Sequence, residues 1–199
     1  MNRILALAPL VVVPAVALAA VSAQEKKPEE KGAPAEMQMT PPQPGPHHAR
    51  IKDFTGAWDA EVESMMGPPG TPPEKSKATE TDMTVGGLWN AMDARGEFGG
   101  MPFHGHGFGG YDSQKKMHVG SWIDSFGDYI TNSEGDCDGT CKVETTNSDM
   151  PNPMGPGRIK VKQVHEWKDK DTREFSMFMQ GPDGAWMQTM KITYHRRVK

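Results

Sequence analysis

The chain has 199 residues, with 26 acidic against 22 basic side chains and a formal charge of -4 at pH 7. This balance argues against nucleic acid as a partner, because affinity for nucleic acids rests largely on lysine and arginine side chains that neutralise phosphates. The densest basic run, Arg196, Arg197 and Lys199 at the C-terminus, is interpreted as a solvated tail.

The first residues have the pattern of a cleavable secretory signal peptide. Arg3 gives a positive start, residues 4–21 form an almost uninterrupted apolar run, and Val21-Ser22-Ala23 supplies the small residues that a signal peptidase requires. We therefore predict a signal peptide over residues 1–23 and export of the remainder to the periplasm or outside the cell. The alternative is an uncleaved anchor, since the run is about long enough to cross a bilayer; no later stretch is apolar enough to do so.

Residues 24–48 predict a disordered linker. They contain few large apolar side chains, and the proline-rich run over residues 41–46 cannot form a helix or a sheet ladder. Such a segment cannot bury enough surface to offset the entropy lost on ordering. His47 and His48 at its end are expected to be solvated, and one folded domain is expected over residues 49–199.

The rest of the chain consists of short segments rich in β-type residues, separated by glycine, proline, aspartate and asparagine. Several alternate between apolar and polar residues, which indicates sheets with one face in water. Because closing such a meander on itself removes its exposed edges, we predict an all-β fold: an antiparallel up-and-down β-barrel of about ten strands, with a β-sandwich as the alternative. The candidate strands lie near Gly56–Met65, Lys77–Val85, Leu88–Phe98, Phe103–Tyr111, Lys116–Ile123, Asp128–Glu134, Thr140–Thr146, Arg158–Trp167, Thr172–Gln180 and Ala185–His195.

Cys137 and Cys141 are the two cysteines of the chain, and the turn signal Asp138-Gly139 lies between them. Two close cysteines in an exported protein form a disulfide by default. We therefore predict a small staple that holds a hairpin turn together. A redox pair or metal site is the alternative, although the spacing matches neither Cys-x-x-Cys nor a common zinc pattern.

The stretch from Met101 to Tyr129 contains G-x-G-x-G-G-Y-D followed by W-x-D-S. This arrangement resembles the signature of the bacterial family called Domain of Unknown Function 1579. Residues 54–58, 85–89 and 190–196 resemble the family's opening Gly-x-Trp, its Gly-Gly-x-Trp and its closing strand. The resemblance covers nearly all of residues 51–197. It implies a lipocalin-like, calycin-type barrel, but no activity and no catalytic residues.

The glycines of this stretch, Gly105, Gly107, Gly109 and Gly110, invite comparison with a phosphate-binding loop. Such a loop requires a strand before it and a helix N-terminus after it, whereas a further strand is expected here. We therefore interpret the glycines as positions of close backbone approach or sharp bending of a barrel strand.

Polar residues on predicted inward faces are candidate ligand contacts. Inside a barrel they must be paired or wet, because burying a polar group without a partner costs about 1–3 kcal/mol. They would therefore form an internal network or line a ligand cavity. The five tryptophans are expected to wall the interior together with Tyr194, and Asp93 is expected to face inward beside Arg95. The predicted ligand contacts are Trp89, Arg95, Trp122, Asp124, Gln163, His165, Trp167 and Tyr194.

His104 and His106 share one face of a predicted strand, and His118 lies on the next strand. With 15 methionines in an exported chain, copper is a metal to consider, because thioether and imidazole are its ligands. Methionine also fills apolar gaps, and no dense Met-x-x-Met array is present. Haem is a second possibility, for which His165 has the inward parity and His195 does not. We predict neither a metal nor another cofactor.

No catalytic constellation is visible: the sequence has neither a Gly-x-Ser-x-Gly elbow nor a His-Glu-x-x-His pair. We expect an exported barrel that binds a small apolar or amphipathic ligand. One alternative is a filled structural barrel that mediates protein interactions in the cell envelope. Another is an enzyme with an unrecognised site. The volume inside the barrel distinguishes a binding module from a filled one.

Overall fold

The computed structural model describes residues 40–68 and 70–198 of the chain. The predicted signal peptide and residues 24–39 of the predicted linker therefore lie outside the described residues. Within the part of the chain that the structure describes, no helix is long and apolar enough to span a membrane.

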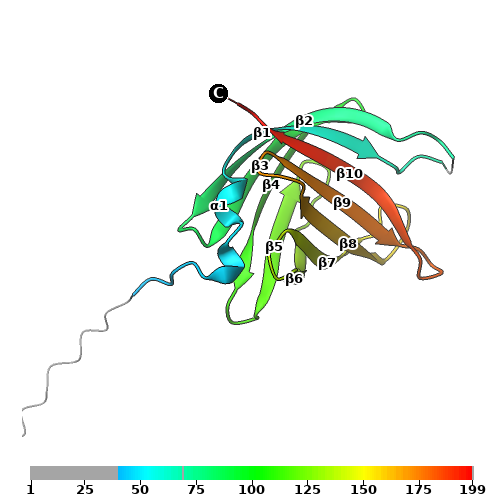
Figure 1. The fold of residues 1–199 in the computed structure, drawn as a ribbon. Helices are drawn as coiled ribbons and strands as arrows, with labels where there is room; N and C mark the ends of the chain where they lie inside the picture. Colours follow the sequence, from blue (N-terminus) through cyan, green and yellow to red (C-terminus); the bar gives the residue numbers. More distant parts are fainter. Residues whose placement is uncertain (1–39, 69, 199) are drawn as a thin grey trace, which may run out of the picture. The chain divides into compact units, whose positions relative to one another are not determined.

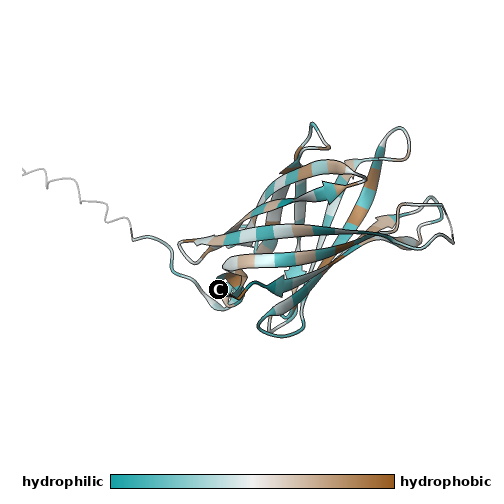
Figure 2. Ribbon diagram, turned by 90° about the horizontal axis from the view of Figure 1, so that it is seen from above, coloured by the Kyte–Doolittle hydropathy of each residue, from teal (hydrophilic) through white to brown (hydrophobic). Residues whose placement is uncertain are grey.

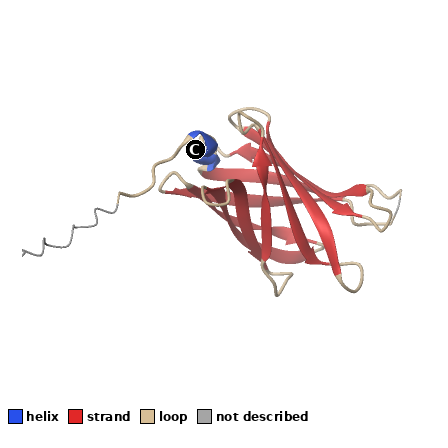
Figure 3. Cartoon of the chain, turned by 90° about the horizontal axis from the view of Figure 1, so that it is seen from below, coloured by secondary structure: helices blue, strands red, loops and turns tan. Residues whose placement is uncertain are grey.

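Ten antiparallel strands close into a barrel in the order β1-β10-β9-β8-β7-β6-β5-β4-β3-β2, so each strand pairs with its neighbours in sequence (Figures 1 and 3). Pairing of β1 with β10 closes the ring, which confirms the predicted up-and-down barrel and excludes the sandwich. The strands are β1 (Gly56–Ser64), β2 (Glu74–Val85), β3 (Trp89–Phe98), β4 (Met101–Asp112), β5 (Met117–Asp124), β6 (Thr131–Cys137), β7 (Val143–Pro151), β8 (Arg158–Trp167), β9 (Thr172–Gln180) and β10 (Trp186–Arg196).

Alternation along each strand places one set of side chains inside the barrel and the other set outside. On β8, Gln163 and His165 face inward, and their cross-strand partners on β9, Met177 and Phe175, face the same way. Figure 2 shows hydrophilic and hydrophobic residues following one another along the strands. This two-sided pattern is what a closed sheet with a partly apolar interior requires.

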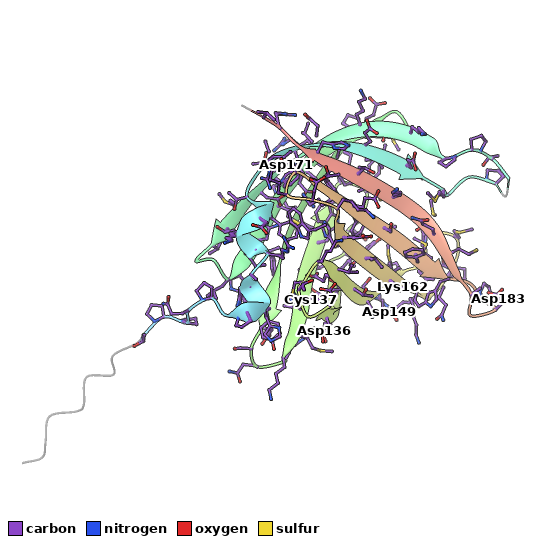
Figure 4. All side chains as sticks on the ribbon, viewed as in Figure 1. Asp136, Cys137, Asp149, Lys162, Asp171 and Asp183 are labelled. Atoms are coloured by element: carbon purple, nitrogen blue, oxygen red, sulfur yellow. A yellow bond between two sulfur atoms is a disulfide. The ribbon has the colours of Figure 1, made fainter. Side chains whose placement is uncertain are left out.

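The helix α1 (Ile51–Phe54) lies at one end of the barrel, which we call the α1 end (Figure 1). The β8–β9 turn with Asp171 is at this end, whereas the β9–β10 turn with Asp183 is at the opposite end, called the far end (Figure 4). Phe54 stacks edge-on against Trp167, with 5.0 Å between the ring centroids. Its carbonyl oxygen accepts a hydrogen bond from the indole nitrogen of Trp58 at 2.8 Å. The short helix is thereby attached to the core.

The core sits at the α1 end. Trp58, Ala60, Trp167 and Tyr194 form its buried cluster, and Phe54 is among the half-buried side chains packed against it. Since this cluster is confined to one end of the barrel, the rest of the interior is left to other side chains or to a cavity.

Residues 46–48 correct the prediction of a linker that is disordered up to residue 48. They form a 3-10 helix, η1 (Pro46–His48), and proline at its first position has a backbone angle already suited to a helix. The ring of His47 stacks on Tyr111 of β4 at 4.1 Å between centroids, and His48 meets the same ring edge-on. An aromatic partner on the barrel, which composition cannot reveal, orders this part of the segment.

Trp186 corrects a second expectation. The register between β9 and β10 shifts between Gln188 and Met190, which marks a β-bulge. Because of this bulge, the β10 residues that precede it point to the opposite face from the one that simple alternation predicts. Met190 and Tyr194 face inward as predicted, whereas Trp186 lies outside with 38% of its surface exposed. Its ring is 5.0 Å from the Nζ atom of Lys162, which lies on the outside of β8 (Figure 4).

Cys137 and Cys141 form the predicted disulfide across the β6–β7 turn (Figure 4). Between them, Asp138 organises the turn: its Oδ1 atom accepts hydrogen bonds from the backbone nitrogens of Thr140 at 3.0 Å and Lys142 at 2.9 Å. The staple lies at the α1 end, where β6 ends and β7 begins.

Candidate ligand-binding cavity

The barrel encloses a cavity of about 350 Å³. This volume is within the usual range of roughly 300–1,000 Å³ for small-molecule pockets. The interior is therefore hollow, which argues against the filled-barrel alternative. The inward-facing side chains that line the cavity include Ala60, Val62, Ser76, Ala78, Glu80, Met92, Ala94, Phe98, Phe103, Trp122, Asp124, Thr131, Ser133, Glu144, Thr146, Met150, Gln163, His165, Arg173, Phe175, Met177, Met190, Ile192 and Tyr194.

Aromatic rings form a continuous wall between the middle of the cavity and the far end. The Trp122 ring stacks on Phe103 at 6.5 Å between centroids, Phe103 stacks on Phe126 at 5.9 Å, and Phe126 meets Phe98 edge-on at 5.9 Å. This wall provides rigid apolar contact area for a ligand.

The glycines of β4 make room for the Trp122 ring. A Cβ atom at Gly105 would lie 2.2 Å from Cζ2 of Trp122, and one at Gly107 would lie 2.6 Å from its Cε3. The indole nitrogen of Trp122 donates a hydrogen bond to Asp124 Oδ2 at 2.9 Å, which fixes the ring against the glycine strand. The interpretation of the glycines as positions of close approach is thereby confirmed for Gly105 and Gly107. Trp122, held in this way, and Asp124 form part of the cavity wall.

We expect Gly105→Ala to lower the free energy of unfolding by about 1–3 kcal/mol, because the added methyl group forces the Trp122 ring out of its place. Gly109→Ala is the matched control on the same face of the same strand, since its Cβ atom would meet only Val119 O, at 3.4 Å. Urea unfolding of both variants measures the difference. Equal losses for the two substitutions would show that the close approach to Trp122 does not matter.

A buried polar cluster lies at the base of the cavity, toward the α1 end. Arg173, which is fully buried, donates hydrogen bonds to Glu80 Oε1 at 2.5 Å and to Asp82 Oδ2 at 2.9 Å. It also donates to His165 Nε2 at 2.9 Å, and its guanidinium carbon lies 3.9 Å from the centroid of the Tyr194 ring. The Nε atom of Arg173 is buried without a hydrogen-bond partner among the residues that the structure describes.

Two carboxylates compete for the single guanidinium of this cluster. Burial, followed by repulsion from Glu80, raises the pKa of Asp82 to about 8. Asp82 is therefore mainly protonated at neutral pH, so that it adds little negative charge beside Arg173. Asn90 donates a further hydrogen bond to Asp82 Oδ1 at 2.9 Å.

His165 is held in one neutral form. A guanidinium can only donate, so the Nε2 atom of His165 must accept the hydrogen bond from Arg173 and the ring proton must reside on Nδ1. Burial, and then the Arg173 cation, lower the pKa of His165 well below its ordinary value. His165 thus contributes a neutral polar surface to the cavity.

The structure brings five of the eight predicted contacts together in the cavity wall: Trp122, Asp124, Gln163, His165 and Tyr194. A sixth, Trp167, is buried in the core at the α1 end and does not line the cavity.

The prediction that Trp89 and Arg95 face inward is wrong. On β3 the residues of even number, including Met92 and Ala94, face the cavity. The Trp89 ring packs against Gly110, and the side chain of Arg95 is 64% exposed and paired with Asp93 on the outer face. Both sets of β3 residues contain apolar side chains, so the alternation of this strand does not by itself identify the inner face.

Sequence reasoning missed the charged centre of the site, Arg173 with Glu80 and Asp82. The sequence did contain a signal for Arg173. At alternate positions of β9 it shares a face with Phe175, Met177 and Met179, and that face is otherwise apolar. An arginine on such a face indicates a buried partner. No comparable signal marks Glu80 and Asp82, because β2 also carries charged residues on its outer face.

The three histidines considered as metal ligands do not converge. His118 is buried at the α1 end, with its Nδ1 atom 3.1 Å from Glu144 Oε2. His104 and His106 lie on the outer face of β4, with a ring separation of 4.4 Å.

The far end of the barrel is apolar and carries few charges. Of its five connections, those over residues 65–73, 99–100 and 152–157 contain no charged residue, and the other two contain one aspartate each, Asp128 and Asp183, whereas the α1 end has the run Lys168-Asp169-Lys170-Asp171. A ligand approaching the cavity from the far end would therefore meet mainly uncharged side chains. The exposed apolar residues at or near this end are Met66, Met101, Ile123, Phe126, Ile130, Met154, Trp186 and Met187.

The family model described as protein of unknown function DUF1579 matches residues 43–196. A search among curated proteins finds no significant match to the sequence.

Among solved structures, the chain is similar to Rv2717c from M. tuberculosis, with 13% identity, 77% of this chain and 99% of that chain covered, and a TM-score of 0.55. It is also similar to the S-type phycobiliprotein lyase CPES from Guillardia theta, with 10% identity, 75% and 90% coverage, and a TM-score of 0.49. A third is the redesigned β-barrel mFAP0 bound to DFHBI, with 12% identity, 72% and 99% coverage, and a TM-score of 0.39. At these identities the comparison with Rv2717c supports the barrel fold alone.

Proposed function

The chain belongs to the DUF1579 family of unknown function, and we propose that its barrel binds one small amphipathic molecule whose polar group is neutral or cationic. The observation that carries this proposal is the cavity of about 350 Å³ with apolar walls and a polar base. We further propose that the barrel works after export, in the periplasm or outside the cell, because the N-terminal run up to Ala23 has the pattern of a signal peptide.

The two ends of the cavity differ in chemistry, which supports an amphipathic ligand. Glu80, His165 and Arg173 line the base, whereas Phe103 and Met150 belong to the wall nearer the far end. Apolar chains gain about 0.8 kcal/mol for each methylene group removed from water. A molecule with its polar group at the base and its apolar part toward the far end satisfies both regions.

The charges inside the barrel favour a polar group that is not an anion. Four acidic side chains line the cavity, Glu80, Glu97, Asp124 and Glu144, whereas Arg173 is the one arginine or lysine among the lining residues. Glu80 already neutralises Arg173 at 2.5 Å, and His165 is neutral. An added carboxylate would therefore meet an excess of negative charge in a region of low dielectric constant. A hydroxyl or an ammonium group would not.

Decylamine, decanol and decanoate test this proposal because they share one chain and differ in the polar group. Each is titrated below its micelle concentration against the purified protein, with intrinsic tryptophan fluorescence as the readout and native mass spectrometry for stoichiometry. We expect decylamine and decanol to bind in a 1:1 ratio and decanoate to bind at least ten-fold more weakly. Binding of none of the three would contradict the amphiphile-binding function, whereas preferential binding of decanoate would contradict only the charge preference.

A pair of alanines on β3 supplies matched variants for the same titration. Ala94→Phe fills the cavity, and Ala91→Phe places the same ring on the outer face of the same strand. We expect Ala94→Phe to weaken binding at least ten-fold and Ala91→Phe to bind as the unmodified chain does, with circular dichroism confirming that both are folded. Equal affinities would place the binding site outside the barrel.

A further inference from the structure

Three metal-ligating side chains converge on the outer face of β3 and β4, outside the cavity. His104 and His106 are two residues apart on β4 and share a face, and Asp93 is the cross-strand partner of His106. The Nε2 atom of His104 lies 3.1 Å from Asp93 Oδ2, and the Nδ1 atom of His106 lies 3.3 Å from the same oxygen. All three ligand atoms lie within 4.8 Å of one another.

We propose that Asp93, His104 and His106 form a binding site for a divalent transition metal of the zinc and copper class. Two imidazole nitrogens and one carboxylate oxygen are a ligand set that such ions accept. Metal–ligand bonds of about 2.0–2.1 Å in a tetrahedral site place neighbouring ligand atoms about 3.3 Å apart. The two measured separations from Asp93 Oδ2 agree with that spacing. Small rotations of the imidazole rings would bring the remaining pair to it.

A hydrogen bond from Arg95 holds the carboxylate of Asp93 in place. Arg95 Nε donates a hydrogen bond to Asp93 Oδ1 at 2.9 Å, and its Nη2 atom donates a longer one to Oδ2 at 3.4 Å. The two histidine rings both approach Oδ2. An outer partner such as Arg95 orients a metal ligand.

The site is accessible from solvent. The side chains of Asp93, His104 and His106 are 31%, 40% and 52% exposed. Three protein ligands on an open face leave a fourth coordination position for water or another small ligand.

A second group with metal-ligating atoms, His118 with Cys137 and Cys141, does not have the same capacity. Its sulfur atoms are joined in the disulfide, and a metal requires the thiolates. The sequence pattern paired His104 and His106 with His118; the register between β3 and β4 provides Asp93 as the third ligand instead.

Isothermal titration of Zn²⁺ into the untagged protein, first freed of metal with EDTA and kept without reductant, tests the proposal. We expect one ion per chain with micromolar or tighter affinity, and binding at least ten-fold weaker in His104→Ala and His106→Ala. His195→Ala is the matched control, because His195 is exposed on the outer face of β10, away from the cluster. Absence of micromolar binding, or equal loss in all three variants, would overturn the proposal.

Co²⁺ distinguishes a built site from loose association with single histidines. We expect the visible absorption bands of a low-coordinate cobalt site in the unmodified chain and in His195→Ala, and their loss in Asp93→Asn. Circular dichroism of each variant shows whether the barrel has remained folded. A spectrum unchanged by Asp93→Asn would exclude this carboxylate from the site and thereby contradict the proposed ligand set.

Discussion

Replacing Arg173 with methionine is expected to lower the free energy of unfolding by about 3–5 kcal/mol at pH 7. The substitution removes the cation from a fully buried position and leaves Glu80 and Asp82 without it. It also removes the donor to His165 Nε2. Breaking a buried ion pair by deleting one partner destabilises by this amount because the remaining charge stays uncompensated in the interior. Urea unfolding followed by circular dichroism measures the loss.

Two further variants separate the effect of the lost charge balance from the loss of a large side chain. The triple variant Glu80→Gln, Asp82→Asn, Arg173→Met has no uncompensated charge, and we expect it to recover more than half of the lost stability. Arg197→Met removes an arginine that pairs with Asp59 on the surface, and we expect a much smaller loss, because exposed ion pairs contribute little to stability. A loss for Arg173→Met as small as that for Arg197→Met would refute the structural role of the buried cluster.

The stability of the chain is expected to fall by about 1–2 kcal/mol as the pH rises from 6.5 to 8. The pKa of Asp82 is about 8 in the folded chain and 3.8 in the ordinary reference state. Between these values the folded state holds a proton that the unfolded state has released, so unfolding becomes more favourable as the pH rises. One pKa unit corresponds to about 1.4 kcal/mol, which gives the expected loss over this interval.

The titration of His165 changes the stability in the opposite direction to that of Asp82, and it sets the lower end of the pH range chosen for the measurement. Its pKa in the folded chain is well below 6.5, so the unfolded state gains a proton first and stability is lost as the pH falls below 6.5. In the unfolded state the ring is half protonated at pH 6.5 and mainly neutral above about pH 7.5, so its contribution opposes that of Asp82 only in the lower part of the interval.

Asp82→Asn is the control for this dependence, because asparagine resembles the protonated acid and does not titrate. We expect urea unfolding of this variant at pH 6.5, 7.2 and 8.0 to give a nearly constant free energy. If the variant and the unmodified chain lose stability in parallel, a group other than Asp82 is responsible.

The buried cluster also explains why the cavity ends where it does. Arg173 packs between the rings of Trp58 and Tyr194, with 4.7 Å and 3.9 Å from the guanidinium carbon to the two ring centroids. Such cation–π contacts strengthen when water is excluded. The cluster therefore lies directly against the aromatic core of the α1 end and forms a polar base for an otherwise largely apolar cavity.

Local sequence determined the strands, their closure into a barrel and several features of the wall. Period-two alternation in β8 and in the C-terminal part of β10 correctly placed Gln163, His165 and Tyr194 inside. The glycines before the Trp-x-Asp segment indicated close packing, and Gly105 meets the Trp122 ring as expected. These features could be predicted because alternation, turn residues and the lack of a Cβ atom act within one strand or its immediate neighbour.

Only the tertiary structure decided which face of β3 is inside, where β10 changes face, and which charged groups meet. Arg173 contacts Glu80 across 93 positions of sequence, and Asp93 meets His104 through the register of β3 against β4. Alternation specifies two faces but does not identify the inner one when both carry apolar residues. That choice depends on burial and register around the closed ring of strands. The lining of the cavity and the proposed metal site both follow from it.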